Sequence, residues 1–454
     1  MTGVREFVET GLEWLDRVPV DWTVAALGRE CWVRARLGWK GLKAEEYVDE
    51  GGFPMLSTPD IKGHDIDFQS AARISEARFD ESPEIALQVG DVLLTKDGST
   101  IGTANIVRDL PEPTTLNGSI ALLTPSRNLD GRYLYYVIVS RYAQAIFDRL
   151  RGGAGVPHLF QRDINRIRIP LPPLDEQRAI ADYLDNETAR IDALVAKQEE
   201  FISLLHERRG AVRDTLLTGG LVQGRGTEST GNAWLPELPR GWRAVPTRRL
   251  LDSGPSNGVS PEADRVGDLR SLSIGAVRNG RVGLADEVTK YVDSAAVRDI
   301  SRLRLEPGDV LIVRGNGNIS LVGRAGLVGN EFSREEFIYP DLLIRIRTTP
   351  DMLPEFFVAA FDAPTSRAQI ELSARTTVGT FKISAGDVRS IVLPCPPLVE
   401  QRTIVENIDE QTSRIDALIA KAEEHIGLAK ERRSALITAA VTGQIDVRTA
   451  RKAS

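Results

Sequence analysis

The most regular hydrophobic pattern in the chain occurs twice. Residues 172–219 and 396–443 align without a gap, and about half of their positions are identical. In each copy, apolar side chains recur at alternating spacings of three and four residues, which is typical of a helix that packs along another helix. The positions predicted to form this seam are Leu184, Glu187, Ile191, Leu194, Gln198, Phe201, Leu205, Arg208 and Val212 in the first copy, and Ile408, Gln411, Ile415, Leu418, Ala422, His425, Ala429, Arg432 and Leu436 in the second.

Proline and glycine residues indicate where these two helices begin and end. Pro172-Pro173 and Pro396-Pro397 precede them, and Thr-Gly pairs at 218–219 and 442–443 follow. We therefore predict long helical segments over 171–220 and 394–446. About 42 helical residues would span roughly 63 Å. The expected partner of each helix is the other one, in an antiparallel intramolecular coiled coil. A helix bundle and a coiled coil with another protein remain alternatives.

The rest of the chain alternates short apolar runs with Gly, Pro, Asp and Asn, which predicts strands and turns. It forms two globules, residues 1–170 and 233–393, each with one predicted helical segment, at 131–150 and 351–372. A Gly/Ser/Thr-rich linker, 221–232, joins the two copies, and 447–454 form a tail. The predicted fold class is α+β: two mixed α/β globules, two long helices and an internal twofold repeat.

Composition and charge exclude several classes of protein. No run of 18 apolar residues predicts a membrane span, and the charged N-terminus does not resemble a signal peptide. Two cysteines form no disulfide framework, which fits the cytoplasm, and four isolated histidines predict no metal site. We recognise no catalytic motif and expect a protein that is not itself an enzyme. The net charge of −7 neither supports nor excludes a nucleic-acid partner.

The repeated block also contains a specific motif. Its first copy reads Pro172-Pro173-Leu174-Asp175-Glu176-Gln177-Arg178 followed by Arg190-Ile191-Asp192-Ala193-Leu194. The second copy reads Pro396-Pro397-Leu398-Val399-Glu400-Gln401-Arg402 followed by Arg414-Ile415-Asp416-Ala417-Leu418. This doubled pattern resembles the specificity subunit of type I restriction–modification systems.

The resemblance implies a non-catalytic subunit with two target-recognition domains, each of which reads one half of a bipartite double-stranded DNA target. Because the two globules have diverged, the expected target is asymmetric. The implied partners are two methylation subunits and translocase/endonuclease subunits. No cofactor is expected on this chain; S-adenosylmethionine, ATP and Mg²⁺ are expected on those partner subunits.

Candidate base-reading residues lie in loops after two matched strands and before the long helices. Arginine suits guanine, whereas Asn and Gln suit adenine. The predicted DNA-binding residues are Lys96, Asp97, Ser99, Thr100, Arg151, His158 and Gln161 in the first globule, and Arg314, Asn316, Asn318, Arg375, Thr376, Thr380 and Lys382 in the second.

Charged and polar residues shared by both helices are the candidates for partner binding. They are Glu176, Gln177, Arg178, Arg208 and Arg209, with Glu400, Gln401, Arg402, Arg432 and Arg433. Glu at a helix start also complements the helix dipole, so a structural role is the alternative for the Glu-Gln-Arg residues. Two other functions stay open: a coiled-coil scaffold without a DNA role, and an enzyme with a divergent active site.

Overall fold

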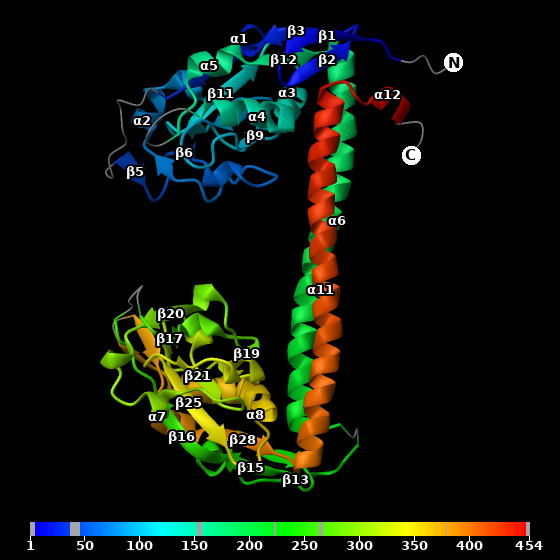
Figure 1. The fold of residues 1–454 in the computed structure, drawn as a ribbon. Helices are drawn as coiled ribbons and strands as arrows, with labels where there is room; N and C mark the ends of the chain where they lie inside the picture. The colour runs from blue at the N-terminus through cyan, green and yellow to red at the C-terminus, as the bar shows by residue number, and fades with distance from the viewer. Residues whose placement is uncertain are drawn as a thin grey trace. The chain divides into compact units, whose positions relative to one another are not determined.

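The two repeated segments form uninterrupted helices in the computed structural model (Figure 1), which describes residues 5–36, 46–151, 157–221, 224–262, 267–377 and 379–450. Helix α6 spans Leu174–Gly219 and helix α11 spans Leu398–Val441. Each helix begins directly after its Pro-Pro pair, and β12 (Arg168–Leu171) and β28 (Val392–Cys395) occupy the positions before those prolines. Gly220 and Gly443, with φ of +72° and +76°, follow the helix ends in the left-handed conformation that glycine favours.

Contacts divide the chain into two compact units. Unit 1 comprises residues 1–199 and 423–454, and unit 2 comprises residues 200–422. Each unit therefore contains one globule, part of α6 and part of α11.

Within each unit the two helices run antiparallel. In unit 1, Arg433 pairs with Asp192 at 2.9 Å and Lys430 with Glu199 at 3.8 Å. In unit 2, Arg209 pairs with Asp416 at 3.4 Å. Residues later in α6 pair with residues earlier in α11, as in an antiparallel arrangement. The predicted intramolecular coiled coil is confirmed.

The buried stripe of the helices differs in part from the predicted seam. Leu184, Ile191 and Leu205 are buried as predicted, but Leu194 and Phe201 are 50% and 42% exposed. Thr188 and Val195 are buried instead. From Leu184 the buried positions are therefore spaced by four, three and four residues, whereas the predicted seam began with a spacing of three. Both patterns describe one face of a helix. The second copy repeats the correction: Leu418 is exposed and Ile419 is buried.

The globule of unit 1 is built on an antiparallel sheet with strand order β4-β11-β8-β9 and a smaller sheet of order β10-β6-β7-β5. Helices α3, α4 and α5, which follow one another along the chain, lie beside these strands (Figure 1). The bounds are β4 (Cys31–Ala35), β11 (Ile120–Pro125), β8 (Val92–Thr95), β9 (Ala104–Ile106), β10 (Thr115–Leu116), β6 (Phe53–Leu56), β7 (Arg73–Ile74), β5 (Tyr47–Val48), α3 (Gly131–Val139), α4 (Arg141–Leu150) and α5 (Gln161–Arg166).

Unit 2 has a larger sheet of order β16-β25-β21-β23-β19-β18 and two three-stranded sheets, β20-β17-β24 and β22-β27-β26. Their strands are β16 (Leu251–Asn257), β25 (Leu343–Thr348), β21 (Val310–Val313), β23 (Ala325–Leu327), β19 (Gly280–Val282), β18 (Val277–Arg278), β20 (Thr289–Val292), β17 (Leu269–Leu272), β24 (Phe337–Ile338), β22 (Gly315–Asn316), β27 (Thr380–Lys382) and β26 (Arg375–Thr377). Helices α8 (Pro354–Phe361), α9 (Pro364–Ser373) and α10 (Ala385–Ser390) correspond to α3, α4 and α5.

Short strands attach each globule to its long helix. In unit 1, β3 (Thr23–Ala26) pairs with β12, and β1 (Phe7–Leu12) pairs with β2 (Leu15–Pro19). In unit 2, β15 (Arg243–Pro246) pairs with β28, and β13 (Thr227–Ser229) pairs with β14 (Glu237–Pro239). The segment predicted as a linker, 221–232, therefore contains a strand. The predicted tail contains the short helix α12 (Val447–Ala450).

The predicted single helical segment of each globule is two helices. Ser140 has extended backbone (φ −67°, ψ 153°), and its hydroxyl accepts a hydrogen bond from the backbone N–H of Ala143. It therefore ends α3 and caps α4. In unit 2, Pro364 at the first turn of α9 enforces the same break. Across the described residues, no helix is both long and apolar enough to span a membrane.

Candidate nucleic-acid interface

In unit 1 the structure brings together the two loops predicted to read bases. The buried strand β8 ends at Thr95, and Lys96 and Asp97 follow it. The backbone N–H of Leu159 donates to the carbonyl of Lys96 at 2.8 Å, and Asp97 forms an isolated β-bridge with His158. The Asp97 carboxylate accepts a hydrogen bond from the His158 ring and an ion pair from the Lys96 ammonium at 2.7 Å. Residues some 60 positions apart thus form one polar cluster.

In unit 2 the corresponding loops form a small sheet. Strand β22 pairs with β27, where Gly315 lies opposite Lys382, and β27 pairs with β26, where Arg375 lies opposite Lys382. A Cβ on Gly315 would lie 3.0 Å from Cγ of Lys382, so glycine permits this close approach. The cations Arg314, Lys382 and Arg375 are consequently held within one short sheet and the residue that precedes it.

The two clusters occupy equivalent places. The backbone N–H of Arg314 donates to Leu342 at 2.8 Å and its carbonyl accepts from Ile383 at 2.9 Å. In unit 1, Lys96 makes the same pair of main-chain hydrogen bonds, donating to Ser119 at 2.9 Å and accepting from Leu159. The backbone frame is shared, whereas the side chains that it presents differ.

Several predicted base-reading residues already form hydrogen bonds with the backbone of their own unit. The Oδ1 atoms of Asn316 and Asn318 accept from the backbone N–H of Asn318 and Ser320, at 2.9 and 3.0 Å. The Gln161 amide donates to the carbonyl of Val33 at 2.6 Å. These amides therefore brace the loops, and only their remaining donors and acceptors are free to meet a base edge.

The remaining predicted readers differ in exposure. Arg151 donates to the carbonyl of Ile101 at 3.1 Å and pairs with Asp148 at 3.0 Å, so it is tied to its own loop. Residues 152–156 of this loop lie outside the described residues. Four other predicted readers are exposed or half-buried: Ser99, Thr100, Thr376 and Thr380.

Sequence reasoning missed an aromatic residue beside the unit 1 cluster. The Phe160 ring is 49% exposed and lies 4.6 Å from the His158 ring. The Arg162 guanidinium lies over Phe160 at 5.0 Å. An exposed aromatic ring and a stacked arginine are both suited to contact bases. The sequence offered one indication of this residue: Phe160 is a large apolar residue in a segment whose hydrophobic pattern predicts neither a strand nor a helix.

The two glutamines at the helix starts are buried and bind the backbone of their own unit. Gln177 is 1% exposed; its amide donates to the carbonyls of Asn128 and Pro172, both at 2.9 Å, and accepts from the backbone N–H of Asp130 at 2.8 Å. Its counterpart Gln401 is fully buried and makes the same three contacts with the backbone of Asp351, Pro396 and Leu353.

The neighbouring glutamates hold the first strands of each globule. Glu176 accepts from the Trp22 indole at 3.1 Å and pairs with Arg5 at 2.6 Å. Glu400 accepts from Trp242 at 2.9 Å and pairs with Arg225 at 2.7 Å. These contacts favour the structural alternative for Glu176, Gln177, Glu400 and Gln401, because their polar groups bind residues at the joint between globule and helix.

The predicted partner-binding arginines fall into two groups. Arg209 and Arg433 pair with Asp416 and Asp192 across the helices, so they belong to the coiled coil. Four others are exposed on the helices and stay candidates for docking: Arg178, Arg208, Arg402 and Arg432.

Other chemistry finds little support in the described parts of the chain. No group of three or more His, Cys, Asp or Glu residues within them could hold a metal ion. Both cysteines are buried, and burial raises the pKa of the Cys31 thiol to about 12. A thiol with so high a pKa is a poor nucleophile at neutral pH.

The comparisons with known proteins agree with the family resemblance that the repeated motif indicates. A family model described as the type I restriction modification DNA specificity domain matches residues 19–202. That match covers the globule of unit 1 and the first part of α6. The resemblance to the specificity subunits of type I restriction–modification systems is thereby confirmed.

Individual relatives extend the similarity over nearly the whole chain. The specificity subunit of the EcoKI enzyme of Escherichia coli K12 is 24% identical over 430 residues, covering 94% of this chain and 90% of the relative. The putative MjaX specificity subunit of Methanocaldococcus jannaschii is 25% identical over 451 residues, covering 96% of each chain. A chain solved in a study of complex assembly and conformational transition of the type I R-M system shares the fold, with a TM-score of 0.70 at 18% identity and coverage of 94% and 99%.

Proposed function

We propose that this chain is the sequence-reading subunit of a type I restriction–modification complex. It has no catalytic role of its own and reads an asymmetric bipartite target on double-stranded DNA. The observation that carries the proposal is the equivalent pair of loop clusters. One backbone frame, repeated in both units, presents Lys96, Asp97 and His158 in one unit and Arg314, Arg375 and Lys382 in the other. Two different sets of side chains read two different half-sites.

The long helices supply the surface for protein partners. Four leucines at equivalent places in the repeat are exposed on them: Leu194 and Leu418 at 50% and 46%, and Leu204 and Leu428 at 55% and 57%. Large exposed apolar side chains that recur in this way mark a protein-binding surface. The repetition supports docking of two copies of one partner, the methylation subunit, with translocase/endonuclease subunits joining that assembly.

The chemistry resides on these partners. S-adenosylmethionine is assigned to the methylation subunits, and ATP and Mg²⁺ to the translocase/endonuclease subunits. A scaffold without DNA readout is less favoured, because it gives no reason for two loop clusters that share a frame and differ in side chains.

The test is to co-express the chain with its methylation partner in a host without other methyltransferases and to map modified bases by single-molecule sequencing. We expect methylation at one bipartite, asymmetric motif, and none when the methylation partner is expressed alone. Methyl transfer or DNA cleavage by the purified chain alone would instead support the enzyme alternative.

A further inference from the structure

Unit 2 contains a cavity at a place where its sequence differs from the equivalent part of unit 1. Gln177 and Gln401 bind equivalent backbone N–H groups, at Asp130 and Leu353, which sets the register between α3 and α8. Six residues further on, α3 carries Tyr136, whereas α8 carries Ala359. In unit 1 the Tyr136 hydroxyl donates a hydrogen bond to Asp185 of α6 at 2.7 Å. An alanine is too short to make this contact, and Ala359 instead lines a cavity in unit 2.

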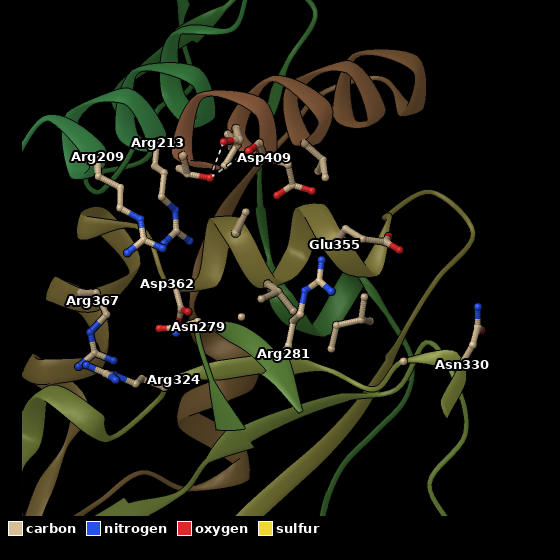
Figure 2. A pocket seen from close by; sticks show the side chains of 18 of the residues that line it. Arg209, Arg213, Asn279, Arg281, Arg324, Asn330, Glu355, Asp362, Arg367 and Asp409 are labelled. Carbon is tan, nitrogen blue, oxygen red and sulfur yellow. Dashed lines mark hydrogen bonds between the residues drawn. The ribbon is translucent and has the colours of Figure 1, made fainter. Parts of the chain in front are cut away.

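The resulting cavity has a volume of about 680 Å³ and lies between α8, α6 and α11 of unit 2 (Figure 2). One wall carries apolar side chains, including Val358, Val405 and Ile408. Four arginines gather at one end, around Asp362: Arg209, Arg213, Arg324 and Arg367.

Arg213 is the distinctive member of this group. It extends from α6 toward Asp362 (Figure 2), yet no hydrogen bond or ion pair within 4 Å joins its guanidinium to another described residue. Burial lowers the pKa of Arg213, and the charges of Asp362 and Asp409 only partly oppose this effect. The equivalent position on α11 is Ile437, a core residue that is 1% exposed. The Arg213 side chain is half-buried, and because no described residue lies within pairing distance of its guanidinium, its N–H donors are available to a ligand in the cavity.

The neighbouring arginines are held in place by contacts that leave donors free. Arg367 donates to the carbonyls of Val322 and Ile319, and Arg324 donates to the carbonyl of Ser320 at 3.3 Å. Asp362 already accepts from the backbone N–H of Ala325 at 3.1 Å, and its burial raises the pKa of its carboxyl. The half-buried Asp362 carboxylate therefore faces several guanidinium groups, while Asp409, Glu331 and Glu355 line other parts of the cavity.

We propose that this cavity binds a small molecule with one phosphate group, which Arg213 and Arg209 hold through charge-assisted hydrogen bonds while the apolar wall contacts the organic part. Guanidinium groups match the planar, paired acceptors of phosphate oxygens. The arginines converge into a cavity rather than across an open face, which favours a small ligand over the backbone of a duplex. The inference does not depend on the DNA-reading function, because binding of phosphate and of a nucleotide is measured on the chain without DNA.

The experiment measures binding of inorganic phosphate and of adenosine monophosphate to the purified full chain, by calorimetry and by thermal unfolding at constant ionic strength with chloride as the reference. At a ligand concentration about ten times its Kd, a ligand that binds only the folded state should raise Tm by about 3 °C. A stronger effect of the nucleotide would identify a phosphate ester, and equal effects would identify free phosphate.

Three variants locate the site. Arg213→Gln removes the unpaired cation, and Ala359→Tyr fills the cavity with the side chain that unit 1 uses; each should weaken binding at least tenfold. Arg433→Gln removes the same charge from the equivalent of Arg209 in unit 1 and should leave binding unchanged. Because Ala359→Tyr copies a packing that the fold already tolerates, it keeps the test valid if Arg213→Gln does not fold.

Three results would overturn the proposal. The first is no effect of either probe on the parent chain at 10 mM, on the order of the weakest affinities that matter for small ligands. The second is an equal effect on all variants, which would show a general ionic effect. The third is an Arg213→Gln variant that loses only DNA affinity in the partner complex, which would assign the arginine to a DNA phosphate.

Discussion

At the scale of single residues, the buried glutamines show how the repeat joins each globule to its helix. Gln401 satisfies two carbonyls and one N–H that its burial would otherwise leave without partners. Replacing it with leucine, which keeps the size but not the polar atoms, should lower the free energy of unfolding by about 2–4 kcal/mol. Urea unfolding, followed through the transition of unit 2, measures the change. In the control variant Arg402→Gln, at the exposed neighbouring position, the free energy of unfolding should change by less than about 0.5 kcal/mol. Equal losses for the two variants would contradict the assigned role.

The readers themselves give a second test at this scale. Lys382 is exposed in the short sheet of unit 2 and takes the place that His158 holds in unit 1. Lys382→Ala should weaken DNA binding by the partner complex about tenfold, the equivalent of about 1.4 kcal/mol. Relaxed methylation should appear in one half of the motif only. A loss spread evenly over both halves would show that Lys382 does not read sequence.

At the scale of elements, two adjacent leucines on α6 separate folding from docking. Leu205 is 5% exposed and packs with Ile415 and Ile419, whereas Leu204 is 55% exposed. Leu205→Ala should cost about 2–4 kcal/mol of unfolding free energy through the cavity that it leaves. Leu204→Ala should cost less than about 1 kcal/mol and should instead weaken capture of the methylation subunit. Chemical unfolding and a pull-down with the partner distinguish the two, and similar stability losses would place both residues in the core.

The helices also show why sequence reasoning succeeded with the elements and erred in detail. Length, direction and pairing follow from the repeated heptads and the prolines at each start, because these features act locally. The exact buried stripe does not, since Leu194 and Val195 are both apolar and only the partner helix decides which is covered. The loop clusters were predicted as separate segments; the hydrogen bond between Lys96 and Leu159 that unites them is long-range and has no local signature. Phe160 and the cavity beside Arg213 were missed for the same reason.

At the scale of the whole molecule, the two units should be independent readers. Exchanging residues 1–170 for the corresponding globule of a relative should change one half of the methylated motif and leave the other half as it was. Because Gln177 and Glu176 remain in the repeated block, the new globule has the same attachment groups available. Methylation mapping of the chimera reads the outcome directly. A change in both halves, or in neither, would refute modular readout.

The attachment by Gln177 has a consequence for how such proteins diversify. Its hydrogen bonds to the globule use main-chain atoms, the Asn128 carbonyl and the Asp130 N–H, which every residue except proline offers alike. Substitutions at those positions therefore leave these hydrogen bonds intact, and genes that recombine within the repeated helix would inherit them. New combinations of half-sites can therefore arise by recombination, without compensating mutations at the positions that Gln177 contacts.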